Sequence, residues 1–199
     1  MNNMSRVVLI MLGVPALAAV VNGASTSENM RTAYNRELNT RLRYEAFAAK
    51  ADAEGYAGVA GVLRAIAFSE SIHAANHYKA MSAPGPQPAD PAAAVVPETT
   101  KENLKAALRA EMNESGKIYP AFVKQAIAEG DARSIMSLKG AMASEGGHAR
   151  IFSKLLKKTG EWKRKIAIIV CRTCGYSSDD PNLKICPFCT HPRGEFAEM

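Results

Sequence analysis

IAFSESIH, residues 66–73, is the segment from which the architecture of this chain can be predicted. Val59, Val62, Ile66, Glu70 and His73 recur every three or four residues, so they share one face of a predicted helix. An ionised Glu on such an apolar face is costly unless a positive partner meets it. A single Glu-x-x-His pair is nevertheless common on solvent-exposed helices, and by itself it does not identify a metal site.

The same pattern recurs in the second half of the chain. Glu145 and His148 are again three residues apart, and they follow a second apolar helical face. A helical stripe with one core-facing Glu precedes each pair. Glu37 lies 33 residues before Glu70, and Glu111 lies 34 residues before Glu145. The matching spacings indicate an internal duplication of a helix pair.

The two halves together supply six candidate metal ligands, namely Glu37, Glu70, His73, Glu111, Glu145 and His148. One Glu from each of two helices and Glu-x-x-His from each of two others form the ligand set of ferritin-like di-iron bundles. Four carboxylates offset much of the charge of two metal ions, and one imidazole per ion suits iron or manganese better than calcium or magnesium. The alternative is four helices with tolerated polar core positions, which leaves the duplicated spacing unexplained.

Length and charge limit the class of protein. The chain has 199 residues, of which 47% are hydrophobic and 22% charged, which is enough for one sizeable core and a small second domain. The net charge of +6 is spread along the sequence without a long basic run. We therefore do not expect nucleic acid as a partner.

Residues 1–24 are predicted to be a targeting segment. Arg6 precedes an apolar run over residues 7–21 that is short and interrupted by Pro15, and residues 22–24 offer small side chains for cleavage. We expect a Sec-type export signal, a periplasmic protein and no stable membrane span after its removal. The alternatives are a retained anchor and a cytoplasmic protein that begins at Met30.

Helical periodicity divides the predicted bundle, residues 27–160, into four helices. They cover about 27–54, from the turn at Gly55 to about 81, 99–129, and 131–160. Residues 82–97 contain five of the ten prolines and predict a long crossover. Two features oppose helix formation: Pro120 removes a hydrogen bond, and Gly146 and Gly147 each cost about 1 kcal/mol relative to Ala.

The helical pattern is lost after Trp162, and residues 166–199 predict a separate small domain. Residues 166–170 read as a short strand, which leads into Cys171-Arg-Thr-Cys174 and, later, Cys186-Pro-Phe-Cys189. Two such Cys-x-x-Cys motifs predict a tetrahedral thiolate site for zinc or a single iron. In an exported protein, two disulfides are the alternative.

These motifs resemble those of the rubrerythrin family over about residues 31–196. The shared marks are Glu37 with Arg41, Arg43 and Tyr44; Glu70-Ser-Ile-His73; Glu111-Met-Asn-Glu114 leading to Tyr119-Pro120; Glu145-Gly-Gly-His148; and the cysteine motifs with Gly175, Tyr176, Thr190, His191 and Pro192. The resemblance implies an all-α, ferritin-like four-helix bundle of duplicated helix pairs. It also implies a rubredoxin-like domain with short β-strands, in which Gly175 lets backbone amides point at the sulfurs.

The resemblance further implies a non-haem di-iron peroxidase that reduces hydrogen peroxide to water in oxidative-stress defence. Its electrons would come from NAD(P)H through a reductase or a rubredoxin and enter at the cysteine-bound iron. In this family the cysteine iron comes closest to the di-iron site across a head-to-tail dimer, so a homodimer is expected. By the same resemblance, the six ligands divide into Glu37 and Glu111 on single irons, Glu70 and Glu145 as bridges, and His73 and His148 completing the shell.

Other residue roles also follow from the resemblance. Glu114 corresponds to an additional carboxylate that exchanges with His73 when the iron changes oxidation state. Tyr44 and Tyr119 would hydrogen-bond ligand carboxylates, although core aromatic packing is an alternative explanation for both. His77 has no role in the resemblance and is predicted to lie on the surface.

Two other functions are compatible with parts of the sequence. A ferroxidase or iron-storage protein would use the same six ligands, but it would need neither Glu114 nor the cysteine domain. A structural or sensing protein with zinc on the four cysteines would need no redox activity.

Overall fold

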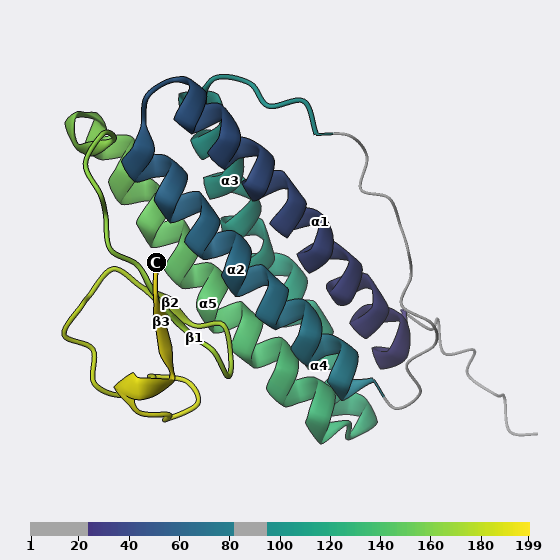
Figure 1. Ribbon diagram of the computed structural model, residues 1–199. Coiled ribbons are helices and arrows are strands. Elements are labelled where there is room, and N and C mark those ends of the chain that lie inside the picture. The colour runs from purple at the N-terminus through teal and green to yellow at the C-terminus, as the bar shows by residue number, and fades with distance from the viewer. Residues whose placement is uncertain (1–23, 82–94) are drawn as a thin grey trace, which may run out of the picture.

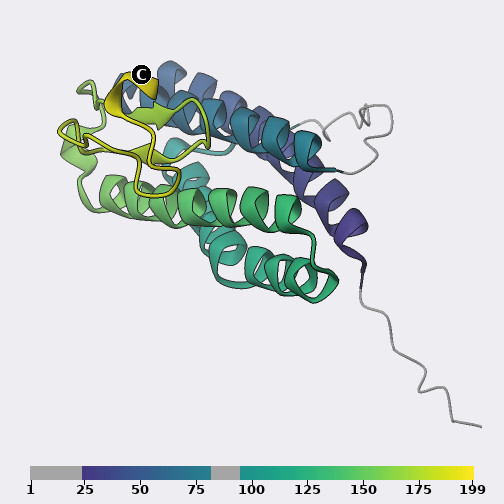
Figure 2. The same cartoon turned by 90° about the horizontal axis from the view of Figure 1, so that it is seen from below.

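The computed structural model describes residues 24–81 and 95–199, which form a helical bundle with a small β-domain packed on one side (Figure 1). The long helices are α1 (Thr26–Ala53), α2 (Ala57–Ala80), α3 (Thr100–Asn113), α4 (Tyr119–Glu129) and α5 (Ala132–Lys157). Figure 2 shows α1 with α2 as one layer and α5 with α3 and α4 as the other. The predicted four-helix bundle of two helix pairs is confirmed. The predicted export signal and most of the predicted crossover lie outside the described residues.

The helix ends follow from local sequence chemistry. Ser25 begins α1 with a capping box to Glu28, and Asp131 caps α5 by accepting a hydrogen bond from the Ser134 amide. Gly130 ends α4 in the left-handed conformation, with φ of 72°, which costs a residue without a side chain little. These caps fix where the chain reverses direction and hence how the ligand-bearing faces meet.

The predicted third helix contains a local irregularity. It includes a π-helical turn, η1 (Glu114–Ile118), in which the Tyr119 amide donates to the Glu114 carbonyl five residues earlier. Pro120 follows at the start of α4, where its missing N–H costs no helical hydrogen bond. The chain is helical from 100 to 129, so the predicted third helix is present, and the unpredicted feature is the wider π-turn within it, directly before Pro120.

Two apolar clusters lie above and below the middle of the bundle. One includes Tyr44, Leu63 and Phe152, and the other includes Met30 and Leu138. On α1, α2 and α5, the polar candidate ligands lie in sequence between the members of the two clusters. A buried polar layer is therefore enclosed by apolar packing at both ends.

The C-terminal domain is a three-stranded antiparallel sheet with the order β2-β1-β3. Its strands are β1 (Ile169–Cys171), β2 (Ser177–Ser178) and β3 (Phe196–Glu198), and a 3-10 turn, η3 (Arg193–Glu195), leads into β3. The domain packs on α2 and α5. A side chain on Gly147 of α5 would come within 3.3 Å of the Ser177 carbonyl, and one on Gly140 would press on the Phe188 ring. Gly147, which has a low helix propensity, therefore leaves room for this domain to pack on α5.

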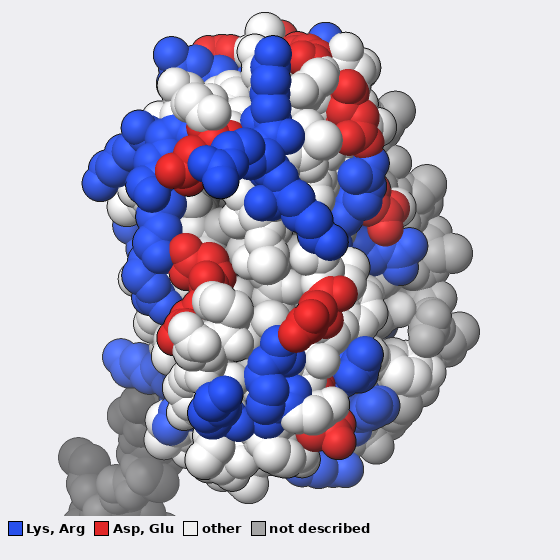
Figure 3. Space-filling view, turned by 60° about the vertical axis from the view of Figure 1, so that its left-hand side comes forward, with Lys and Arg blue, Asp and Glu red and all other residues white. Residues whose placement is uncertain are grey.

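The molecular surface mixes both signs of charge. On the face in Figure 3, Lys and Arg side chains lie on several parts of the molecule with Asp and Glu among them. Within residues 24–81 and 95–199, no helix combines the length and apolar character needed to cross a membrane.

Candidate metal centres

The six side chains predicted to bind metal meet in the middle of the bundle, and each is at most 1% exposed. They form two groups of four, and within each group one possible ligand atom per residue lies within 4.8 Å of the others. The first group is Glu37, Glu70, His73 and Glu145, and the second is Glu70, Glu111, Glu145 and His148. Glu70 and Glu145 belong to both groups.

Glu70 and Glu145 each divide their two oxygens between the two imidazoles. Glu70 Oε2 lies 2.8 Å from His73 Nδ1, while its Oε1 lies 3.3 Å from His148 Nδ1. Glu145 Oε1 lies 3.0 Å from His73 Nδ1, and its Oε2 lies 2.8 Å from His148 Nδ1. Two carboxylates placed in this way can bridge a pair of metal ions.

The other two carboxylates are each oriented by a tyrosine. The Tyr119 hydroxyl donates to Glu37 Oε1, and the Tyr44 hydroxyl donates to Glu111 Oε1. The remaining Oε2 atom of each carboxylate is buried and has no hydrogen-bond partner among the described residues. These two buried acceptors without donors fit a centre completed by cations.

The protonation of this cluster supports the same conclusion. Burial, reinforced by the Glu145 and Glu70 charges, raises the pKa of Glu37 and Glu111 well above their ordinary value. Burial opposes protonation of His73, but the Glu145 and Glu70 carboxylates outweigh it and raise the pKa of His73 to about 9. Without cations the cluster therefore holds protons, which divalent ions would displace.

Glu114 lies beside the cluster but outside both groups of four. It is 3% exposed and forms an ion pair with Arg36. Burial and the Glu145 charge raise the pKa of Glu114 to about 7, although Arg36 opposes that shift. Sequence reasoning missed Arg36, because neither its position before Glu37 nor its separation from Glu114 gives a recognisable spacing.

The prediction that His77 lies on the surface is wrong, because its side chain is fully buried. His77 Nδ1 lies 2.8 Å from Ser137 Oγ, and His77 Nε2 lies 3.0 Å from the Tyr119 hydroxyl. Burial, with a contribution from His73, lowers the pKa of His77 to about 3 and keeps the ring neutral. Its place four residues after His73 on the same helical face was the available sequence signal.

The four cysteines form a second candidate metal site. Cys171 Sγ lies 3.6 Å from Cys189 Sγ, Cys174 Sγ lies 3.5 Å from Cys186 Sγ, and all four thiols are free of disulfides. The hydrogen bond between Cys171 and Cys174 lowers the pKa of Cys171 to about 4 and raises that of Cys174. Four free cysteines grouped in this way fit one tetrahedral metal ion, which would bind them as thiolates.

Gly175 is the junction between the two centres. Its φ of 82° turns the chain after Cys174, and its own amide donates to the Cys171 carbonyl at 2.9 Å. The Gly175 carbonyl accepts hydrogen bonds from Ser69 and Ser144, the residues that directly precede Glu70 and Glu145. A side chain at 175 would collide with His73 Nε2.

This junction lies within a single chain. The closest approach of the two centres across a head-to-tail dimer, expected from the family resemblance, stays a prediction because the structure holds one chain. The cysteine domain reaches the bundle of its own chain, and the Asn76 side chain also donates to the Thr173 carbonyl at 2.9 Å. The homodimer therefore stays a prediction, but proximity of the two centres does not require it.

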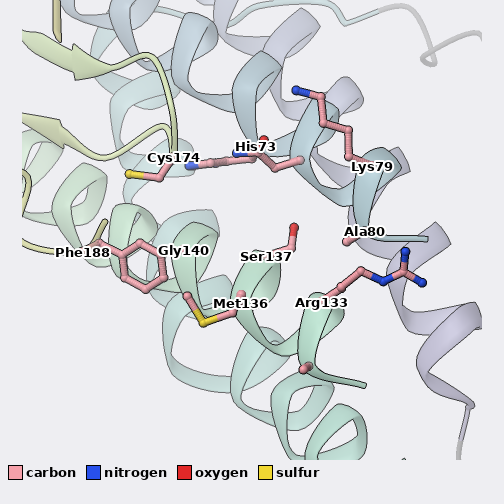
Figure 4. A pocket seen from close by; sticks show the side chains of 11 residues that line it. His73, Lys79, Ala80, Arg133, Met136, Ser137, Gly140, Cys174 and Phe188 are labelled. Atoms are coloured by element: carbon pink, nitrogen blue, oxygen red, sulfur yellow. The ribbon is translucent and has the colours of Figure 1, made fainter. Parts of the chain in front are cut away.

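A pocket of about 560 Å³ opens beside both centres (Figure 4). His73 and Cys174 lie at its inner end, while Lys79 and Met136, both exposed, lie toward the surface. The Ser137 side chain also lines the pocket, and Figure 4 shows its hydroxyl pointing into it.

Known proteins match both the sequence and the fold. The family model described as rubrerythrin matches residues 28–156. The rubrerythrin of Porphyromonas gingivalis is 31% identical over 186 residues, covering 90% of this chain and 92% of that protein. Rubrerythrin-2 of Clostridium acetobutylicum is 27% identical over 179 residues, covering 88% and 97%. A solved structure of nigerythrin in a partially reduced state covers 100% of both chains with a TM-score of 0.82 and 24% identity, which supports the fold.

Proposed function

This chain belongs to the rubrerythrin family, and from that premise we propose that it is a non-haem di-iron peroxidase that reduces hydrogen peroxide to water. The observation that best supports the proposal is the double bridge, in which Glu70 and Glu145 each face both imidazoles. Bound iron would supply the two electrons needed to cleave the O–O bond. Glu37 and His73 would hold one ion and Glu111 and His148 the other, with the two bridging carboxylates shared.

The surrounding side chains orient the ligands and exclude water. Tyr44 and Tyr119 hold one oxygen of Glu111 and Glu37, which leaves the second oxygen of each directed toward the centre. Glu114 forms an ion pair with Arg36 and belongs to neither group of four. We propose that it replaces the neutral His73 when the positive charge of the centre rises, because that exchange adds one compensating negative charge.

The contact at Gly175 gives electrons a short route from the cysteine site to the bundle. Ser69 and Ser144 bind the Gly175 carbonyl and are each covalently adjacent to a bridging carboxylate residue. We propose that an iron on the four cysteines receives electrons from a rubredoxin or an NAD(P)H-dependent reductase and passes them along this route. We also propose, from the sequence and the family resemblance, that the protein is exported and forms a homodimer.

The two alternative functions leave this contact unexplained. A ferroxidase or iron-storage protein would use the bundle ligands without needing a thiolate site against them. A structural zinc site would not need to lie next to His73 and the bridging residues. The visible spectrum of protein purified with its native metals separates these cases, since ferric thiolate is coloured and zinc thiolate is not.

Replacing Cys174 with Ser tests the proposed electron route. We expect Cys174→Ser to abolish steady-state peroxide turnover with an external donor. The chemically reduced variant should still consume about one equivalent of peroxide, because two ferrous ions suffice for one two-electron reduction. Unchanged steady-state turnover would show that electrons bypass the cysteine site, and failure of the reduced wild-type protein to consume peroxide would refute the peroxidase function.

A further inference from the structure

We propose that Ser137, His77 and Tyr119 form a proton relay from the pocket in Figure 4 to the Glu37 carboxylate. The inference rests on the proposed function, because reducing one hydrogen peroxide to two waters consumes two electrons and two protons. The four candidate carboxylate ligands are fully buried, so protons reach them only through other side chains, and His73 is the candidate ligand that lines the pocket. A buried centre of this kind needs a defined path for them.

The relay is a continuous set of side-chain hydrogen bonds from four different helical segments. Ser137 Oγ lies 2.8 Å from His77 Nδ1, His77 Nε2 lies 3.0 Å from the Tyr119 hydroxyl, and that hydroxyl bonds Glu37 Oε1. His77 and Glu37 are fully buried, and Tyr119 is 2% exposed. Ser137 alone is partly exposed, so the path has one end in the pocket and one end at the centre.

The hydrogens of this chain all point in one direction. A metal-binding carboxylate can only accept, so Tyr119 must donate its single hydrogen to Glu37. The Tyr119 oxygen then accepts from His77 Nε2–H, which leaves Nδ1 of the neutral ring without a hydrogen. Nδ1 therefore accepts from the Ser137 hydroxyl. The geometry assigns every donor, and each donates toward the centre.

The outer end of the relay is accessible to water. Figure 4 shows the Ser137 hydroxyl directed into the pocket, between Lys79 on α2 and Met136 on α5. Met136 is 60% exposed, so the pocket wall continues to the molecular surface. Water in this pocket can give a proton to Ser137 without entering the bundle.

The duplicated half of the molecule lacks these groups at the matching positions. Tyr44 occupies the place of Tyr119 and donates to Glu111, but Phe152 stands 75 residues after His77, and Val62 stands 75 before Ser137. The packing is conserved, because the Tyr44–Phe152 ring centroids are 5.5 Å apart and the His77–Tyr119 centroids 5.9 Å. The polar groups are therefore not a requirement of the fold.

One passage moves one proton inward and shifts the His77 hydrogen from Nε2 to Nδ1. Pocket water protonates Ser137 Oγ and becomes hydroxide as the serine proton passes to His77 Nδ1, the Nε2 proton passes to the Tyr119 oxygen, and the tyrosine proton passes to Glu37 Oε1. The two ring nitrogens cannot exchange a hydrogen directly, so between passages the His77 ring swings toward the pocket, loses its Nδ1 hydrogen to water and regains one on Nε2, while the two hydroxyls rotate back. Two passages supply the two protons that one peroxide consumes.

Ser137→Val and Ser137→Thr form a matched pair for testing the relay, because their side chains are nearly isosteric and only Thr keeps the hydroxyl. After confirming equal iron content, the fully reduced full-length proteins are mixed with peroxide in single-turnover experiments. We expect Ser137→Val to lower the rate at least about tenfold and Ser137→Thr to restore it to within about twofold of wild type. His77→Phe, which introduces the residue found at the matching position 152 of the other half, should be at least as slow as Ser137→Val. Equal rates for the Val and Thr variants would overturn the relay.

A second measurement does not depend on peroxidase activity. In the full-length chain loaded with diamagnetic zinc, ¹⁵N NMR of histidine should show neutral His77 with its proton on Nε2 and a hydrogen bond accepted at Nδ1. Ser137→Val should remove that accepted hydrogen bond, and Ser137→Thr should retain it. A proton on Nδ1 or a cationic ring would overturn the relay. If wild-type protein does not consume peroxide, the proposed function fails and this tautomer alone decides whether the directional hydrogen-bond chain exists.

Discussion

The two halves of the bundle bind equivalent carboxylates with equivalent tyrosines, yet they differ in what lies behind each tyrosine. In the open arm, defined as Glu37, Tyr119, His77 and Ser137, polar contacts continue to a pocket. In the closed arm, defined as Glu111, Tyr44, Phe152 and Val62, the tyrosine is followed by apolar side chains. The two halves share the same tyrosine–carboxylate pairs at the centre. The residues that contact each tyrosine differ between the halves, so the surroundings of the two candidate metal positions are chemically distinct.

Burial explains why the closed arm excludes water. Val62, Phe152 and Tyr44 are all fully buried in the larger apolar cluster, together with Leu63 and Leu104. Each of these side chains lies in dense apolar packing, where an unpaired polar group would be costly. Protons should therefore reach the centre from the Glu37 side.

The largest effect is expected when the closed arm is given the residues of the open arm. The double variant Val62→Ser/Phe152→His places two polar groups in the apolar cluster without access to the pocket. We expect the free energy of unfolding to fall by about 3–5 kcal/mol, measured by urea denaturation, with no gain in single-turnover peroxide rate. A faster reaction would show that the closed arm can be hydrated, and the contrast between the arms would fail.

Removing each tyrosine hydroxyl compares the arms directly. Tyr119→Phe and Tyr44→Phe each delete one hydrogen bond to a carboxylate, but only Tyr119→Phe also interrupts the relay. We expect a fall of about 100-fold in the single-turnover peroxide rate for Tyr119→Phe and of less than about fivefold for Tyr44→Phe. Stopped-flow measurements on variants with equal iron content provide the comparison. Equal losses would mean that both tyrosines act only by orienting carboxylates.

The buried carboxylates of the two arms, Glu37 and Glu111, should change the stability with pH in the same direction. In the metal-free protein, burial raises the pKa of Glu37 and Glu111 above 4.5 and the neighbouring carboxylates raise that of His73 to about 9. Groups with raised pKa stabilise the folded state at low pH, and this contribution is lost as pH rises through the folded pKa. The melting temperature of chelator-treated protein should therefore fall between about pH 6.5 and pH 9, where His77 is neutral in the folded and unfolded states and does not oppose the change.

Substituting the carboxylates tests whether that property is shared. Glu37→Gln and Glu111→Gln should each reduce the pH dependence of the melting temperature by a similar amount, because both carboxyls are fully buried. Circular dichroism at several pH values provides the measurement. A reduction confined to one variant would show that the arms differ in electrostatics as well as in access to solvent.

The smallest effect is expected at Arg36, which lies next to Glu37 in sequence and pairs with Glu114. Arg36→Met should raise the pKa of Glu114 above its value of about 7, because the nearby positive charge is removed. Arg36 is partly exposed, so the loss in stability should be no more than about 1 kcal/mol. Infrared titration of the Glu114 carboxyl, assigned with Glu114→Gln, would detect the shift, and an unchanged titration would show that Arg36 does not influence Glu114.

The grouping of the six candidate ligands could be predicted from the sequence because they repeat at helical spacing in two related segments. The cysteine domain was equally recognisable, since its Cys-x-x-Cys motifs are local. His77 was misplaced because a single histidine gives no sign of its partners, which come from α4 and α5. The π-turn before Pro120 and the contact of Gly175 with Ser69 and Ser144 depend on tertiary packing that no local pattern encodes.

The roles proposed for the open and closed arms require a pair of metal ions in the bundle, so metal stoichiometry tests the central claim most directly. Protein isolated from iron-replete cells of its own host should contain about three irons per chain, two in the bundle and one on the cysteines. Mössbauer spectroscopy should assign about two-thirds of the iron to oxygen and nitrogen ligands and the rest to a tetrahedral thiolate site. One tightly held metal per chain, with the bundle carboxylates empty, would contradict the account.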